Sequence, residues 1–274
     1  RDAEHTKWNR LAKFFLRLGE SLACYIPHRT ITVSQVLLRD CLERFGCQAV
    51  YISHPFELMP VPTDHVLKEH ELTSEKYFLF VGRLIPHKQA HMLVKAYARA
   101  REQHPELFKD IPLVIVGGGA WTDDYVKWLY RLGASVPGVR FLGERFGPEL
   151  QVLQAHAMAH VFPTLSEGLA LAMLEAGAYA RPSIMTGLPQ NREALGYQTI
   201  EIKMNDEQDL TRALIQMVSL SSDERHIMGQ ASYKHVKTVF DVEDRIDDMD
   251  ALYREVIGQS AVLTTPCLGP AMAS

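Results

Sequence analysis

Two basic residues in one short loop of this 274-residue chain have the types and spacing of an anion site. Arg83 and Lys88 stand five residues apart, directly after the apolar run Phe78–Val81. A guanidinium offers forked donors and an ammonium offers a point charge, which suits a diphosphate. Surface loops often carry both residue types, so the pair alone leaves an ordinary loop as the alternative.

Two carboxylates occur in a second stretch, residues 166–178. Ser166 has the character of an N-cap, and helix-forming residues follow it, so we predict a helix over this stretch. In such a helix Glu167 and Glu175 lie about 12 Å apart along the axis and about 80° apart around it. One ligand could therefore contact both carboxylates.

The start of that helix offers backbone donors. Free amides at Gly168 and Leu169 could bind phosphate or sugar oxygens. Glu175 stands among Ala, Leu and Met residues, where a carboxylate needs hydrogen-bond donors, and the vicinal hydroxyls of a ribose would supply them. A structural carboxylate paired with a neighbouring arginine is an equally good interpretation of this residue.

A glycine run follows the apolar stretch Leu113–Val116. Gly117 and Gly118 would let the backbone approach a ligand or make a tight turn. The run lacks the spacing of a dinucleotide fingerprint and of a Walker A loop, which argues against both kinds of site.

Strand and helix patterns alternate along the chain at the spacing of a doubly wound parallel sheet, whose ligands bind at the carboxyl ends of the strands. Each loop discussed above follows a predicted strand. We predict strands at 30–33, 49–53, 77–81, 113–116, 139–142, 159–163, 183–186 and 200–202, and helices at 3–24, 35–45, 89–103, 122–132, 148–156, 166–178, 207–220, 222–237 and 241–257.

Composition narrows the function classes. The net charge of -4 argues against an extended nucleic-acid surface, which needs an excess of Lys and Arg. Four cysteines without a CxxC pair indicate free thiols in a reducing compartment, so we expect a cytoplasmic protein. No apolar run is long enough to span a bilayer. The helix pattern at 3–24 carries an apolar stripe between basic residues, which favours packing on a sheet, with contact to an anionic membrane as the alternative.

Together these motifs resemble a known family. Gly82-Arg83-Leu84 with Lys88, then Leu113–Gly118, Val139–Gly143 and Phe162–Glu175 follow one another as in the nucleotide-sugar half of retaining GT-B glycosyltransferases of family 4. The resemblance covers roughly residues 77–195. Gln89 departs from it, since the family usually has Gly after the lysine, and the aromatic-Gly pattern is replaced at Leu169-Ala170-Leu171. These departures leave the sugar open.

The resemblance implies a metal-independent transferase that moves a sugar from a nucleoside-diphosphate sugar to a sugar or lipid-linked acceptor, with retention and without a cofactor, in polysaccharide or glycoconjugate synthesis. Arg83, Lys88 and Glu167 are the implied catalytic residues. Arg83 and Lys88 would bind the diphosphate, Glu167 the sugar hydroxyls and Glu175 the ribose. The implied donor-binding residues are Gly82, Gly117, Gly118, Gly168, Leu169 and Glu175.

Two metal-like patterns have ordinary interpretations. His156 and His160 stand four apart, but His160 begins a predicted strand, so we interpret both as core or surface histidines. Asp248-Met249-Asp250 resembles a DxD motif but lies in a charged helical stretch, which indicates a solvated helix face.

The domain organisation implied by the resemblance is incomplete. Most of the family's N-terminal domain, including its catalytic-centre histidine, has no match, so we expect a fragment or a chain whose first domain comes from elsewhere. A non-catalytic nucleotide-sugar-binding or scaffolding module is therefore the alternative function, and an epimerase is a weaker third. We predict a remnant of the acceptor-side α/β domain at 1–57, a linker at 58–75, a Rossmann-like donor domain at 76–238, a crossing helix at 239–257 and a disordered tail at 258–274.

Overall fold

A computed structural model describes residues 9–56, 63, 65–119 and 123–258. The chain divides into two compact units, which we call the terminal unit (residues 1–55 with 240–274) and the sheet unit (residues 56–239). Residues 259–274 of the predicted tail lie outside the described residues, as do residues 58–62 and 64 of the predicted linker.

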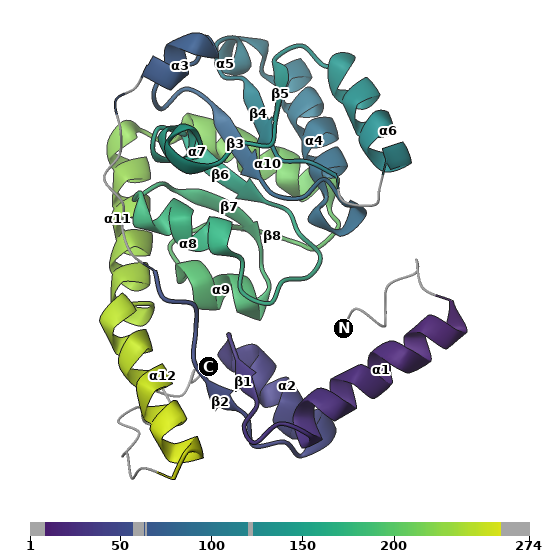
Figure 1. The fold of residues 1–274 in the computed structure, drawn as a ribbon. Coiled ribbons are helices and arrows are strands. Elements are labelled where there is room, and N and C mark those ends of the chain that lie inside the picture. Colours follow the sequence, from purple (N-terminus) through teal and green to yellow (C-terminus); the bar gives the residue numbers. More distant parts are fainter. Residues whose placement is uncertain (1–8, 57–62, 64, 120–122, 259–274) are drawn as a thin grey trace. The chain divides into compact units, whose positions relative to one another are not determined.

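Six parallel strands form the core of the sheet unit, in the order β5-β4-β3-β6-β7-β8 (Figure 1). β3 pairs with both β4 and β6, so the sheet grows in both directions from β3. This is a doubly wound topology, and the predicted α/β fold class is confirmed. The strands are β3 (Phe78–Val81), β4 (Leu113–Val116), β5 (Val139–Gly143), β6 (Ala159–Phe162), β7 (Ser183–Thr186) and β8 (Ile200–Ile202).

Helices connect successive strands of the sheet (Figure 1). Prolines at the first helical turn begin both α5 and α9, two short helices that the sequence pattern did not predict. The described helices of this unit are α3 (His65–Glu69), the 3-10 helix η2 (Pro86–Lys88), α4 (Ala90–Gln103), α5 (Pro105–Phe108), α6 (Asp123–Ala134), α7 (Gly147–Ala155), α8 (Leu171–Ala178), α9 (Pro189–Leu195), α10 (Glu207–Ser219) and α11 (Ser222–Val239).

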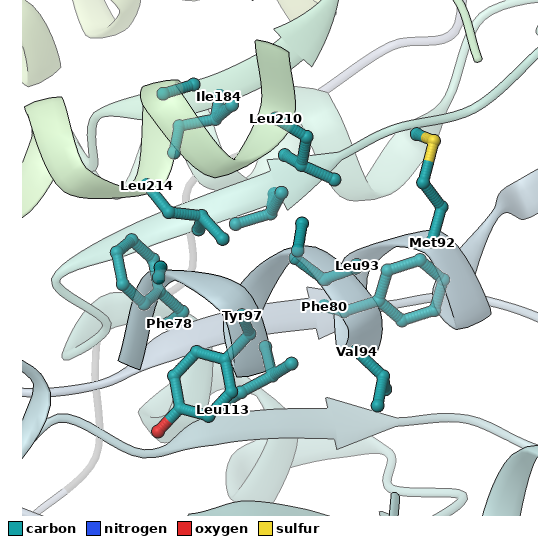
Figure 2. Close-up of a cluster of buried hydrophobic side chains, with 14 of the residues drawn as sticks. Phe78, Phe80, Met92, Leu93, Val94, Tyr97, Leu113, Ile184, Leu210 and Leu214 are labelled. Carbon is teal, nitrogen blue, oxygen red and sulfur yellow. The ribbon is translucent and has the colours of Figure 1, made fainter. Parts of the chain in front are cut away.

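Side chains of β3 alternate between two hydrophobic cores because successive residues of a strand point to opposite faces. Phe78 and Phe80 pack with Leu93 and Tyr97 of α4 and with Leu214 of α10 (Figure 2). On the other face, residues of β3 and β4 pack against α3 and α7. The strands contribute Leu79, Val114 and Val116, and the helices contribute Val66, Leu67, Val152 and Leu153. The two cores fix the strand ends, from which the site loops emerge.

The terminal unit contains two strands, β1 (Ile31–Thr32) and β2 (Val50–Tyr51), which pair in parallel. Its helices are α1 (Arg10–Tyr25), α2 (Gln35–Phe45) and α12 (Val242–Val256). Ser34 caps the start of α2, and Gly46 ends the helix in the left-handed conformation. No helix among the described residues is long and apolar enough to cross a membrane.

Four details of the predicted elements are wrong. α1 does not pack an apolar stripe on a sheet, because none of its residues is buried and its large apolar side chains other than Leu16 are exposed, including Phe14 and Phe15. Residues 65–69 of the predicted linker form α3, since Val66 and Leu67 fill a core. The helix predicted from residue 166 begins only at Leu171.

The fourth correction concerns the predicted solvated face of α12. Asp248 is buried there, and its Oδ2 lies 3.2 Å from Nη2 of Arg245, which is also buried. The ion pair within the helix lets the carboxylate be buried. Asp250 is exposed and pairs with Arg254 one turn later, as a solvated face requires.

Candidate functional site

Backbone hydrogen bonds join the loops that follow β3 and β6 at the carboxyl edge of the sheet. The amide of Leu165 donates to the carbonyl of His87 over 2.9 Å, and the hydroxyl of Thr164 lies 3.4 Å from the same oxygen. β3 and β6 are neighbours in the sheet, so their loops meet although they lie far apart in sequence. This junction positions two of the predicted site residues, Lys88 and Glu167.

Lys88 and Glu167 form an ion pair across this junction. Nζ of Lys88 lies 2.5 Å from Oε1 of Glu167, and the two side chains are only 19% and 11% exposed. Lys88 comes from the end of η2, and Glu167 from the loop before α8. The structure therefore brings together a cation and a carboxylate that the sequence separates by 79 residues.

A small cavity of about 20 Å³ is lined in part by this ion pair. Such a volume holds about one water molecule, whereas ligand pockets span roughly 300–1,000 Å³. A nucleotide would therefore lie above the pair or displace it. The cavity is lined by Lys88 and Glu167 together with Phe80, Val81, Phe162, Thr164, Ala170 and Ala172.

Arg83 is exposed at the end of β3, close in sequence to Lys88. Its loop is tied to the next strand end, because the amide of Leu84 donates to the carbonyl of Gly118 over 2.7 Å. Within the described ranges, no carboxylate lies within ion-pair distance of the Arg83 guanidinium. Its forked donors are thus available to an anion at this edge.

Gln89 follows Lys88 with a left-handed backbone (φ +59°). Its amide donates to the carbonyl of Pro86, which ends η2, and α4 begins one residue later. Residues other than glycine adopt this conformation rarely. The usual family glycine is thus replaced by a side chain that keeps the backbone conformation a glycine would favour.

Gly117 is required by the packing of two strand ends. Its φ is +144°, and a Cβ atom added to it would lie 1.9 Å from the carbonyl oxygen of Gly82. Its amide donates to the carbonyl of Gly143 over 2.8 Å, which ties the ends of β4 and β5 together. Gly118 accepts the bond from Leu84 described above. These contacts give the glycines a structural role, and their approach to a ligand stays a prediction.

Glu175 lies in the second turn of α8 and is held by an amide of α7. Nε2 of Gln154 donates to Oε2 of Glu175 over 2.7 Å, and Gln154 is buried. The structural alternative considered from the sequence paired Glu175 with a neighbouring arginine. The partner in the structure is a glutamine. A carboxylate oxygen can accept more than one bond, so Glu175 keeps capacity for hydroxyl groups.

Glu167 and Glu175 do not share a helix, so the predicted separation of two helical turns is wrong. Gly168 and Leu169 precede α8, and Leu169 is buried. The first turn of α8 is instead closed by Ala170, whose carbonyl accepts from the amide of Met173. The predicted amides of Gly168 and Leu169 therefore belong to a loop, and their contact with phosphate oxygens stays a prediction.

His160 supports Gln154 from β6. Its Nε2 lies 3.0 Å from the backbone oxygen of Gln154, and its ring stacks on Phe162. Complete burial lowers the pKa of His160 to about 4, so the ring is neutral near pH 7. The interpretation of His160 as a core histidine is thus confirmed by its burial. Gln154 itself was missed, and its only signal was a lone amide among Val152, Leu153 and Ala155.

The described residues contain no cluster of three or more His, Cys, Asp or Glu side chains that could hold a metal ion. The predicted site residues bring two cations, Arg83 and Lys88, and two carboxylates, Glu167 and Glu175, to loops and helix α8 at the carboxyl edge, together with backbone amides. Such a set can bind an anion and several hydroxyl groups.

The family model described as "Glycosyl transferases group 1" matches residues 75–219. Among curated proteins, the chain is 27% identical over 181 residues to O-antigen chain mannosyltransferase B of Escherichia coli, covering 66% of this chain and 45% of that protein. It is 32% identical over 190 residues to D-inositol 3-phosphate glycosyltransferase of Stackebrandtia nassauensis, covering 67% of this chain and 42% of that protein. The chain thus spans less than half the length of these two relatives.

Solved structures show the same fold. The structure of Anabaena Alr3699/HepE in complex with UDP and glucose superposes with a TM-score of 0.76 at 18% identity, covering 88% of this chain and 66% of that one. S. aureus TarM, in a complex that includes UDP, superposes with a TM-score of 0.73 at 15% identity, covering 92% of this chain and 49% of that one. The predicted GT-B type fold is therefore confirmed.

Proposed function

Because the chain belongs to the group 1 glycosyl transferases, we propose that it transfers a sugar from a nucleoside-diphosphate sugar to an acceptor hydroxyl. The observation that carries this proposal is the Lys88–Glu167 pair, which sets a cation suited to phosphate beside a carboxylate suited to hydroxyl groups, at the carboxyl edge of the sheet. A nucleoside-diphosphate sugar presents the matching ligand groups side by side, because the hydroxyls of its sugar adjoin the diphosphate.

The chemistry proposed is stabilisation of the leaving group. As the glycosidic bond breaks, negative charge grows on the diphosphate, and Arg83 and Lys88 are the cations that would stabilise it. The Lys88 ammonium would leave Glu167 for the phosphate or would contact both groups. In either case Glu167 would accept hydrogen bonds from the sugar hydroxyls. The acceptor hydroxyl would attack from the face that the diphosphate leaves, with its proton passing to a phosphate oxygen. This route retains configuration and requires no metal or cofactor.

The acceptor and the rest of its site are also part of the proposal. We propose a sugar or lipid-linked acceptor in polysaccharide synthesis; the relatives named as O-antigen chain mannosyltransferases support the part of this proposal that concerns polysaccharide synthesis. Since those relatives are longer, we propose that further sequence supplies much of the acceptor site. A second candidate function is a non-catalytic module that binds nucleotide sugars.

Glu175 tests the nucleotide site. Replacing Glu175 by Gln is expected to weaken binding of a nucleoside diphosphate about 10- to 100-fold, because hydrogen bonds from the ribose to a charged carboxylate become weaker bonds to a neutral amide. Calorimetric titration of the purified chain with UDP, GDP and ADP measures this. The loss should vanish with the 2′,3′-dideoxy nucleotides, which lack the hydroxyls.

Glu106→Gln, an exposed change in α5, is the matched control and should bind as the wild type does. Equal binding by the Glu175 variant would contradict the ribose role. No nucleotide binding by the wild type would contradict the proposed function as a whole. Nucleotide binding without hydrolysis of donors or transfer to sugar and lipid-linked acceptors would favour the binding module.

We further propose a cytoplasmic chain that contacts an anionic membrane through α1. Phe14 and Phe15 are 61% and 59% exposed on that helix, and basic residues such as Lys13 and Arg17 flank them. An apolar face between cations is the pattern of an interfacial helix. The wild type should sediment with vesicles that contain phosphatidylglycerol, and a Phe14→Ser, Phe15→Ser variant should not.

Phe146→Ser, which removes an exposed aromatic ring from the sheet unit, is the control and should sediment as the wild type does. Equal sedimentation with neutral phosphatidylcholine vesicles, or retention by the double variant, would contradict the membrane role of α1.

A further inference from the structure

A third carboxylate, that of Glu144, lies at the carboxyl edge and has no role in the function proposed above. Glu144 follows β5 directly, and its side chain crosses over the glycine run after β4. A Cβ atom added to Gly118 would lie 2.5 Å from Oε1 of Glu144 and 2.7 Å from its Cδ atom. The carboxylate therefore lies directly against the backbone of Gly118.

This carboxylate is available for a ligand. Glu144 is exposed, and within the described part of the chain its carboxylate has no hydrogen-bond or ion-pair partner. The adjacent Arg145 does not neutralise it, because Nε of Arg145 lies 2.6 Å from Glu149 and its Nη1 donates to the backbone oxygen of Glu144. Among the residues that the structure describes, no donor thus reaches these two acceptor oxygens.

The strand order places Glu144 at a useful distance from the phosphate-binding cations. β5 and β3 are separated by one strand, β4, so the ends of β5 and β3 are about 10 Å apart. Arg83 follows β3, and Gly117 and Gly118 form the backbone between the two ends. A nucleotide whose diphosphate lies at Arg83 could extend its base across this glycine run toward β5.

α7 connects the loop that carries Glu144 to Glu175, the carboxylate proposed to bind the ribose. The helix begins at Gly147, three residues after Glu144, and its Gln154 holds Glu175. The cations, Glu175 and Glu144 are thus attached to neighbouring loops and one connecting helix of the sheet unit. In the strand order the end of β3, which carries the cations, lies between the ends of β5 and β6, so Glu144 and the loop that leads to Glu175 lie on either side of the proposed diphosphate site.

We propose that Glu144 reads the base of the donor and selects guanine. Guanine presents an N–H and an adjacent amino group on its Watson–Crick edge, which two carboxylate oxygens accept as a pair. Uracil presents one N–H between two carbonyl oxygens that repel a carboxylate, and adenine pairs its amino donor with an acceptor nitrogen. The inference rests on the proposed donor site and narrows its substrate class to guanosine-diphosphate sugars.

Calorimetric titration of the purified chain with GDP, UDP and ADP tests this. The wild type is expected to bind GDP about 10- to 100-fold more tightly than UDP or ADP, the range for one paired base contact. Glu144→Gln should lose most of that preference through weaker GDP binding, with UDP binding unchanged or improved. Glu102→Gln, an exposed change in α4, is the control and should keep the preference.

The outcomes separate this inference from the function on which it rests. Equal affinities for GDP and UDP, or a preference for GDP that survives in Glu144→Gln, would overturn the role of Glu144 and leave the donor site standing. The absence of binding to every nucleotide would overturn both. Thermal melting of Glu144→Gln at the wild-type temperature shows that a changed preference is not a folding defect.

Discussion

Replacing Lys88 by Ala is expected to lower the rate of sugar transfer about 100- to 1,000-fold, the range seen when one preorganised group that stabilises developing negative charge is removed. Lys88 is the cation fixed at the junction of the loops after β3 and β6. Its loss also leaves the carboxylate of Glu167 without its cation, next to the place proposed for the phosphates. Charge repulsion then adds to the lost attraction.

Binding measurements isolate the phosphate contribution. Lys88→Ala should weaken the binding of a nucleoside diphosphate at least about tenfold. It should change the binding of the matching nucleoside very little, since only the diphosphate carries phosphate. Lys95→Ala, an exposed change in α4, removes the same charge from the protein and should alter neither. Equal losses for nucleoside and diphosphate would mean that Lys88 acts on the fold or the base and not on the phosphates.

Replacing Gly117 by Ala is expected to destabilise the sheet unit by about 3 kcal/mol or more. The new methyl group would lie 1.9 Å from the carbonyl oxygen of Gly82, and the φ of +144° is outside the range that alanine favours. Relief requires the ends of β3 and β4 to move apart, which would break the bond from the amide of Gly82 to the carbonyl of Val116. Urea unfolding followed by circular dichroism measures the loss.

Gly82→Ala is the matched control because it changes the other glycine of the same contact. Its added Cβ atom would meet only the Phe80 ring, at 3.7 Å, which is ordinary van der Waals contact. We expect its free energy of unfolding to stay within about 1 kcal/mol of the wild type. A Gly117 variant as stable as the Gly82 variant would show that the strand ends yield easily, contrary to this account.

The sheet could be predicted from the sequence because buried parallel strands are short apolar runs. β4, β7 and β8 have the bounds that their patterns predict. The start of α8 could not be predicted, since Ser166 and its neighbours favour a helix locally. In the structure the hydroxyl of Thr164 donates to the carbonyl of Ser166, and Leu165 binds the loop after β3. Tertiary hydrogen bonds outweigh helix propensity here.

The candidate site was predictable as a set of loops but not as a set of contacts. Arg83, Lys88 and Glu167 were identified from motifs, and the carboxyl-edge rule placed their loops together. The pairing of Lys88 with Glu167 depends on side-chain geometry between distant segments. The hydrogen bond from Gln154 to Glu175 depends on how α7 packs beside α8, and the hydrophobic periodicity of the sequence does not determine that packing.

The left-handed turn at Gln89 has a consequence for the entropy of ligand capture. α4 begins immediately after this turn, and its first turns are anchored by the buried Ala90 and Leu93. The backbone that carries Lys88 is therefore immobilised when the core forms, before any donor arrives. Ordering one residue's backbone costs about 1–2 kcal/mol, and that cost is met during folding. An arriving diphosphate would need to restrict only the side chain of the lysine.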